Sequence, residues 1–404
     1  MSVFYLIFIA LSAYFSFRYD GIEEYNNHKQ HRLWLMCIYL ICLTGFSYGL
    51  GADKFTYMDE FEEYPNTFDE IGDIIFQQIV FKGEMPLWTI LNLACKSWFD
   101  SFYAVQLLES ATINIAVCYL ASKYTHRYFL FLLVYFFSLQ YFIFNTEVMR
   151  EGFALGIMLL GMDAYVCGEK WKFFLALPLA LLFHISAAVV LLFLFARFRI
   201  TWKTLIYAFF ASFLIWFLSD HVLGKFMVLA LGGMGAFVGK ALYYAIQATT
   251  IFGFLRWALI YLVFPFIIMY TSTKFEPSEE LKKRKEKFIA FMLILGVIAS
   301  AMSGFIRLYN YTYIFYLIMF ADFIYMLIRY KEHLIVRLGT FAGTLFFISQ
   351  LYFGHYNTTD TYFYQFFYPY TCILDEDADV FFRPIAHNEA TELKMEDNNT
   401  RDIE

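Results

Sequence analysis

The chain has 404 residues, of which 60% are hydrophobic, 22% are aromatic and 16% are charged. Soluble domains are about 45–50% apolar and about 25% charged, so this composition excludes a water-soluble globule. The net charge is −6, but acids gather at 51–73 while bases gather at 274–287, which indicates loops on opposite sides of a membrane.

Long apolar runs between charged breaks predict an all-α polytopic membrane protein with about ten transmembrane helices. Runs such as 128–144 are continuously apolar, whereas the strands of a membrane barrel alternate in polarity. We expect one multi-spanning domain over 1–374 and a polar, disordered tail over 375–404. The predicted spans are 3–17, 33–50, 102–121, 128–145, 149–167, 203–219, 252–272, 288–304, 308–328 and 334–352.

The apolar run 173–196 differs from the other spans because basic residues flank it on both sides and it contains Pro178 and His184. As a re-entrant hairpin it would place every basic cluster on the cytoplasmic side and both termini outside. A plain tilted span is the alternative, and the residues leave both open. Irregular backbone at membrane depth is tolerated only beside protein or a watery cavity, so a hairpin would also indicate a site.

Two loops and one aromatic segment complete the predicted topology. The loop 51–101 is external and carries an interfacial helix at about 84–98, whose apolar residues have helical spacing with Trp near both ends. The loop 273–287 is basic and cytoplasmic, and the aromatic segment 362–370 is expected on the membrane surface.

Two arginines lie at the outer ends of predicted spans. Arg150 begins the fifth span and Arg307 begins the ninth. Each could reach the interface simply by snorkelling. Together, at one depth, they favour a clamp for a phosphorylated lipid headgroup, because the planar guanidinium binds phosphate oxygens in a bidentate way.

Other polar residues in or near the spans are candidates for proton transfer or for structure. Asp53 follows a Gly-x-Gly turn at the outer end of the second span, and His184 lies in the middle of the split run. A lone buried histidine is more often a packing residue, and His184 on this evidence fits that role. A structural polar network is expected within the third span, formed by Gln106, Glu109, Ser110, Thr112 and Asn114.

Six short motifs follow one another between about residues 40 and 370, and together they resemble the EpsG-type family of bacterial exopolysaccharide and O-antigen (Wzy-like) polymerases. The central Phe183-His184-x-Ser186-Ala187 element is the most specific. The others are Gly49-x-Gly51-x-Asp53-x-x-x-Tyr57, Glu84-x-Pro86-Leu87, Arg150-x-x-x-Ala154, Arg307-x-Tyr309 and Tyr368-Pro369-Tyr370.

The resemblance implies a glycosyltransferase-C-like membrane enzyme of the bacterial cytoplasmic (inner) membrane. Its substrate would be an undecaprenyl-diphosphate-linked oligosaccharide, joined to another repeat unit at the outer face. Further expected partners are membrane lipid and the chain-length regulator and flippase of the same pathway; no nucleic acid is expected. A transporter or flippase of lipid-linked sugars, and a non-catalytic assembly component, are the alternatives.

Such a reaction needs cations for the leaving diphosphate, a base for the acceptor hydroxyl and surfaces for sugar or lipid. Arg150 and Arg307 would hold the diphosphate, and Asp53 is favoured over His184 as the base. No cofactor and no metal are expected, because the acids at 59–63 lie on a loop without fixed octahedral geometry. The predicted sugar and lipid contacts are Tyr57, Glu84, Trp88, Tyr309 and Tyr311.

Overall fold

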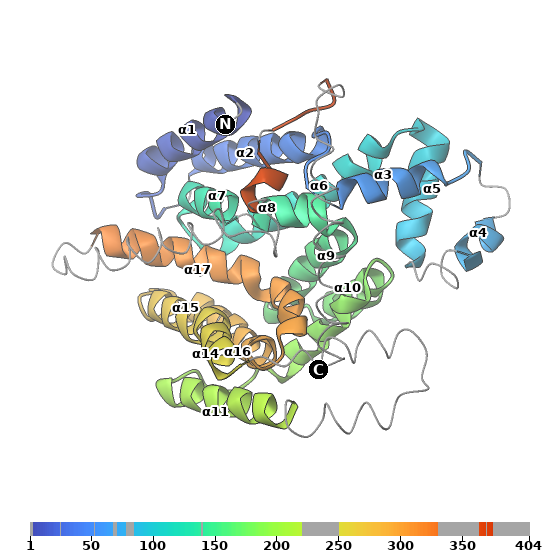
Figure 1. Cartoon of the computed structure of the whole chain (residues 1–404). Helices are drawn as coiled ribbons and strands as arrows, with labels where there is room; N and C mark the ends of the chain where they lie inside the picture. The colour runs from blue at the N-terminus through green and yellow to red at the C-terminus, as the bar shows by residue number, and fades with distance from the viewer. Residues whose placement is uncertain are drawn as a thin grey trace. The chain divides into compact units, whose positions relative to one another are not determined.

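The fold was analysed in a computed structural model, which describes residues 3–24, 26–51, 53–67, 71–77, 85–138, 140–219, 250–329, 363–368 and 370–374. The regular elements within these ranges are all helices, as predicted (Figure 1). Spatial contacts divide the chain into two compact units. The first comprises Met1–Leu160, Leu175–Ala187 and Leu327–Glu404, and the second comprises Gly161–Phe174 and Ala188–Met326.

The first unit is built on two helix pairs, in which α1 packs along α7 and α2 packs along α6. Asn26 starts α2 by accepting a hydrogen bond from the Lys29 amide, which satisfies an otherwise unpaired N–H of the first turn. Its helices are α1 (Val3–Tyr19), α2 (Asn27–Gly45), α3 (Lys54–Glu62), α4 (Ile71–Gln77), α5 (Pro86–Phe99), α6 (Phe102–Tyr124), α7 (Tyr128–Phe137), α8 (Gln140–Phe142), the π-helix η2 (Ile143–Glu147) and most of α9 (Met149–Val166).

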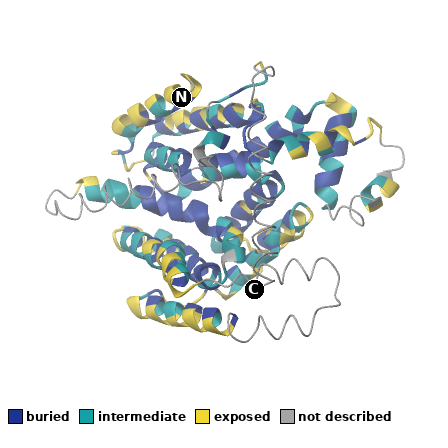
Figure 2. Ribbon diagram, in the orientation of Figure 1, coloured by how far each residue is buried: buried dark blue, intermediate teal, exposed yellow. Residues whose placement is uncertain are grey.

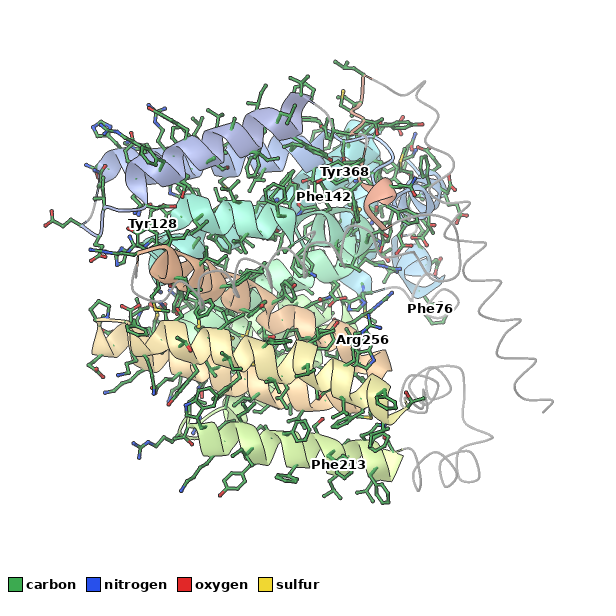
Figure 3. The ribbon with its side chains drawn as sticks, turned by 60° about the vertical axis from the view of Figure 1, so that its left-hand side comes forward. Phe76, Tyr128, Phe142, Phe213, Arg256 and Tyr368 are labelled. Carbon is green, nitrogen blue, oxygen red and sulfur yellow. The ribbon has the colours of Figure 1, made fainter. Side chains whose placement is uncertain are left out.

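The aromatic segment near the C-terminus packs into the first unit instead of lying on the membrane surface. Phe366 and Phe367 are buried, and Phe142 stacks on Phe367 at 5.2 Å between ring centroids and meets Tyr368 edge-on at 5.8 Å (Figure 3). The backbones of Cys372 and Ser47, which follows α2, pair in an isolated antiparallel β-bridge. The expectation for 362–370 was therefore wrong for these residues, because the rings find apolar partners inside the protein.

In the second unit, α16 is the central helix and contacts α11, α14, η5, α15 and η6. Thr201 and Thr204 form a capping box at the start of α11. The unit contains the end of α9, the start of α10 (Lys170–Leu181), the 3₁₀-helix η3 (Ile185–Phe195) from Ala188 onward, α11 (Trp202–Leu218), α14 (Ile251–Ala258), η5 (Leu259–Val263), α15 (Phe264–Lys274), α16 (Glu279–Ala301), η6 (Ser303–Tyr309) and α17 (Asn310–Arg329) as far as Met326.

The predicted basic loop 273–287 is shorter in the structure, because α16 begins at Glu279. The Ser278 side chain accepts a hydrogen bond from the Leu281 amide, and Glu279 and Glu280 occupy the first turn, where acids favour a helix start. The basic residues from Lys282 onward therefore project from a helix and have fixed spacing.

Three helices among the described residues are long and apolar enough to cross a membrane: Phe102–Tyr124, Ile251–Lys274 and Gly304–Arg329. A fourth span results if Tyr128–Phe137 and Gln140–Glu147, which are bent by 80°, count as one. Shorter apolar helices lie at Val3–Tyr19, Ile185–Phe195 and Trp202–Leu218. About ten spans therefore stays a prediction, and the predicted span 334–352 lies outside the described residues.

Helix α11 presents an apolar surface outward. It buries Leu205, Ser212 and Trp216, whereas Tyr207 and Phe210 are 69% and 64% exposed. Exposed positions recur along α11 in Figure 2. Contiguous apolar surface of this kind is unfavourable in water and indicates contact with lipid or protein.

The run 173–196 contains a backbone break at 182–184. The helix α10 ends at Leu181, three residues after Pro178, and η3 begins at Ile185. In the first unit, the Leu87 amide at the start of α5 donates a hydrogen bond to the Leu182 carbonyl at 3.0 Å. The helix predicted at about 84–98 is found at Pro86–Phe99 and thus begins beside this break, while its place at the membrane interface stays a prediction. The re-entrant path itself stays a prediction.

Candidate functional site

The turn after α2 depends on glycine and places Asp53 at the start of α3. Gly51 has a φ of +87°, and a Cβ atom there would lie 2.7 Å from Glu147 Oε1. The Gly51 amide donates to the Phe366 carbonyl at 2.8 Å. A residue with a side chain would strain this backbone and displace Glu147, so the turn requires glycine.

The Asp53 backbone contacts a carboxylate from a distant helix. The Asp53 amide donates to Glu147 Oε2 at 3.4 Å, in the first turn of α3, where N–H groups lack helical partners and favour negative charge. The Asp53 side chain is half-buried and does not cap its own helix. Asp53 is therefore held at the N-terminus of α3 by its backbone, and its carboxyl group is left to interact elsewhere.

Arg150 lies over the Tyr57 ring, with its Cζ atom 5.5 Å from the ring centroid. Burial raises the pKa of the Tyr57 hydroxyl, and the charge of Arg150 and a hydrogen bond with it oppose that rise. The negative charge of Asp53 also reaches Tyr57 and raises this pKa. Asp53, Tyr57 and Arg150 therefore form one electrostatically coupled group.

An aromatic series connects Tyr57 to the break that carries His184. Tyr57 meets Trp88 edge-on at 5.5 Å, Trp88 meets Phe153 at 6.3 Å, and Phe153 stacks on Phe183 at 4.8 Å. Tyr57 and Trp88 are 7% and 1% exposed. Their rings therefore support Arg150 and the helices from within, and neither presents an open face for stacking a sugar in this conformation.

His184 follows directly after this series and contacts Ser186. Its Nδ1 lies 2.6 Å from Ser186 Oγ and 3.3 Å from the Ser186 amide nitrogen. An amide N–H can only donate, so this geometry favours the tautomer in which Nδ1 accepts and Nε2 carries the proton. Neutral His184 is then a hydrogen-bond donor through Nε2.

Buried Lys54 and Glu109 and half-buried Glu147 form a charged group behind the turn, and the sequence did not single it out as a site. Lys54 is fully buried, and its Nζ has no hydrogen-bond partner among the described residues. Burial lowers the pKa of Lys54 to about 7, and the charges of Glu109 and Glu147 oppose this effect. One available sequence signal was Lys54 itself, the lone base in an acidic loop directly beside Asp53.

The polar network expected in α6 forms only in part. Gln106 Nε2 donates to the Ser47 carbonyl at 2.9 Å, and Asn114 Nδ2 donates to Asn145 Oδ1 at 2.8 Å. Glu109 is separate, because neither of its carboxylate oxygens has a hydrogen-bond partner among the described residues. A Cβ atom on Gly152 would lie 2.3 Å from Glu109 Oε1, so glycine at the start of α9 makes room for this carboxylate.

Three of the remaining predicted residues belong to the second unit, and Glu84 is not among the described residues. Arg307, Tyr309 and Tyr311 belong to the second unit, where Arg307 is exposed in η6 and both tyrosines are buried. Tyr309 meets Tyr261 edge-on at 5.1 Å. The pairing of Arg307 with Arg150 stays a prediction, and Glu84 lies outside the described residues.

The part of the chain that the structure describes contains no group of three or more His, Cys, Asp or Glu side chains able to hold a metal ion. The expectation that the acids at 59–63 lie on a loop was wrong, because α3 extends to Glu62 and Glu63 follows it directly. Metal independence stays a prediction.

Comparison with known proteins identifies one family. The model of the EpsG family matches residues 32–372, most of the chain. No curated protein and no solved structure matches. The matched range contains the turn at Gly51, the Arg150 group and the His184 break of the first unit.

Proposed function

The chain belongs to the EpsG family, and we propose that it is a membrane glycosyltransferase that polymerises a surface polysaccharide. The family and the apolar helices indicate an integral membrane protein of polysaccharide biosynthesis. The proposed substrate is an oligosaccharide repeat unit on undecaprenyl diphosphate, and the proposed location is the outer face of the cytoplasmic membrane. The observation that carries this proposal is the Arg150 guanidinium, which lies over the ring of Tyr57, a residue that the charge of Asp53 also reaches.

The diphosphate is assigned to Arg150. This residue lies in the first turn of α9, where the helix dipole adds positive potential to the guanidinium. The Tyr57 ring lies against the guanidinium, and the planar fork of N–H donors on a guanidinium matches the geometry of phosphate oxygens. Arg307 is proposed as the second cation.

The proposed reaction is a substitution at the anomeric carbon of the donor glycan. The acceptor hydroxyl oxygen bonds to this carbon, the bond from the carbon to the diphosphate oxygen breaks, and its electron pair leaves with the diphosphate. Asp53 accepts the hydroxyl proton. Arginines stabilise this step because they neutralise charge that grows on the leaving group.

His184 is assigned to positioning. Because Nδ1 accepts from the Ser186 amide, Nε2 carries the proton and can donate to a substrate oxygen, whereas a general base needs an unprotonated nitrogen. This geometry supports Asp53 over His184 as the base.

The test is elongation of a synthetic undecaprenyl-diphosphate oligosaccharide by purified protein in detergent. Asp53→Asn should reduce elongation by a factor of about 10²–10⁴, the usual contribution of a general base, while donor binding is retained. Asp59→Asn is the matched control, because Asp59 is an exposed acid on the same helix. Normal elongation by Asp53→Asn would contradict the assignment of the base. Substrate movement across vesicles without elongation by the wild-type protein would favour a transporter instead.

A further inference from the structure

A charged cavity lies in the second unit, between the end of α9 and the start of α16. Its volume is about 340 Å³. The proposed reaction does not use it, and its lining is mostly basic and aromatic. The lining residues are Tyr165, Val166, Cys167, Glu280, Lys283, Arg284 and Lys287.

The cations of this cavity are only partly neutralised. Arg284 pairs with Glu280 one turn earlier. Lys283 and Lys287 form no ion pair with any carboxylate among the described residues. Lys285, on the same helix, is different: its Nζ lies 2.7 Å from Glu276 and 3.0 Å from Asp322. The protein thus neutralises a buried lysine with two acids on one face of α16 and leaves net positive charge on the face toward the cavity.

Arg197 and Lys170, which do not line the cavity themselves, add positive charge near Lys287. Arg197, which follows η3, donates from Nη2 to the Tyr165 hydroxyl at 2.7 Å. Lys287 Nζ lies 4.1 Å from the centroid of the same Tyr165 ring and 4.8 Å from that of Phe193. Burial lowers the pKa of Lys287 to about 8, and the charges of Arg197 and Lys170 contribute to this shift. Neighbouring like charges disfavour the charged form of each group. A bound anion would offset this repulsion.

Exposed aromatic residues flank the same cations in the sequence. Trp171, 65% exposed, follows Lys170, while Phe195 and Phe198, 73% and 40% exposed, lie on either side of Arg197. Basic residues beside exposed aromatic rings are typical of the boundary between lipid headgroups and hydrocarbon. This pattern is the one expected of a cavity at the depth of a phospholipid phosphate, and a soluble anion would not contact the apolar flanks.

We propose that the cavity lined by Tyr165, Lys283 and Lys287, with Arg197 behind Tyr165, binds the phosphate headgroup of an anionic phospholipid. Basic pockets between membrane helices bind such headgroups in other proteins. The acyl chains would lie along the exposed aromatic residues. The lipid would join the end of α9 to the start of α16, so it would also stabilise the second unit.

The test measures lipid retained by the purified, delipidated protein in native mass spectrometry. Phosphatidylglycerol, phosphatidylcholine and inorganic phosphate are added in parallel at equal concentration. The wild type should retain phosphatidylglycerol in preference to phosphatidylcholine. Lys283→Gln with Lys287→Gln should weaken this binding by about fivefold for each lysine removed. Lys282→Gln is the matched control, because Lys282 lies on the same helix, pairs with Glu279 and does not line the cavity.

Two further arms make the result decisive. Lys287→Arg keeps the charge and should restore binding to near the wild-type level, which a general folding defect at this position would not allow. Equal retention of both lipids by the wild type, or equal loss in the Lys282→Gln control, would overturn the proposal. Competition by inorganic phosphate as strong as that by phosphatidylglycerol would overturn the lipid assignment and leave a free phosphate site.

Discussion

Replacement of Arg150 by lysine keeps the charge at the proposed diphosphate site and removes the planar fork. The Arg150 Cζ lies 5.5 Å from the Tyr57 ring centroid, and Tyr57 is only 7% exposed. A cation over an aromatic ring contributes about 0.5–1 kcal/mol at an exposed position and about 2 kcal/mol when water is excluded. A lysine would keep part of this contact.

The larger loss concerns the phosphate. A hydrogen bond to a charged group contributes about 1.5–3 kcal/mol, and an ammonium cannot reproduce the second parallel bond of a guanidinium. Together with the weakened ring contact, we expect a loss of about 2–3 kcal/mol in transition-state binding, which corresponds to about a 30- to 160-fold decrease in kcat/KM.

The assay is elongation of the lipid-linked oligosaccharide at several donor concentrations, with the amount of inserted protein measured in parallel. Arg256→Lys is the matched control, because Arg256 also lies over a ring, with its Cζ 5.3 Å from the Trp257 centroid, and is exposed in the second unit (Figure 3). It should change kcat/KM by less than about twofold, as surface substitutions usually do. Wild-type kcat/KM for Arg150→Lys, or an equal decrease in both variants, would refute the reasoning.

The other predictions concern the buried charges, the histidine and the metal. The pKa of Lys54 is lowered to about 7 in the folded protein, so between this value and the ordinary lysine pKa the unfolded chain binds more protons than the folded one. The free energy of unfolding should therefore rise with pH above 7, by at most about 1.4 kcal/mol per pH unit. Thermal unfolding in detergent should show a smaller rise for Lys54→Met. Lys54→Met leaves the Glu109 carboxylate without its cation, so the double variant with Glu109→Gln should unfold at a higher temperature than the single variant; a lower temperature would show that the two charges are not coupled. His184→Gln should raise the KM for donor more than it lowers kcat, because it removes a positioned donor and no base; a loss confined to kcat with normal donor binding would reverse the roles of His184 and Asp53. Elongation should continue after treatment with a chelator, and a strict requirement for added Mg²⁺ would shift the diphosphate site from the arginines to the acids at 59–63.

The sequence predicted the helical class, the membrane setting and many helix boundaries correctly, because these depend on residues a few positions apart. A helix is found at Pro86–Phe99, where one was predicted at about 84–98, and the run 173–196, for which a hairpin and a plain span were both left open, has a break between α10 and η3. Apolar runs, proline and capping side chains act locally. The basic loop before α16 was predicted too long. The cap at Ser278 is also a local signal, and it starts the helix before the charged residues that suggested a loop.

Tertiary structure alone decided which polar groups from distant parts of the sequence meet. Glu147 contacts the Asp53 amide across 94 positions of the sequence, and the Thr371 hydroxyl bonds to the Tyr48 carbonyl across 323. No local pattern carries such a pairing. It follows from how α3, η2 and the C-terminal segment pack. Packing also determines protonation: Lys54 would be an ordinary solvated lysine in a loop, but burial behind the Gly51 turn lowers its pKa, and acids distant in the sequence oppose this effect.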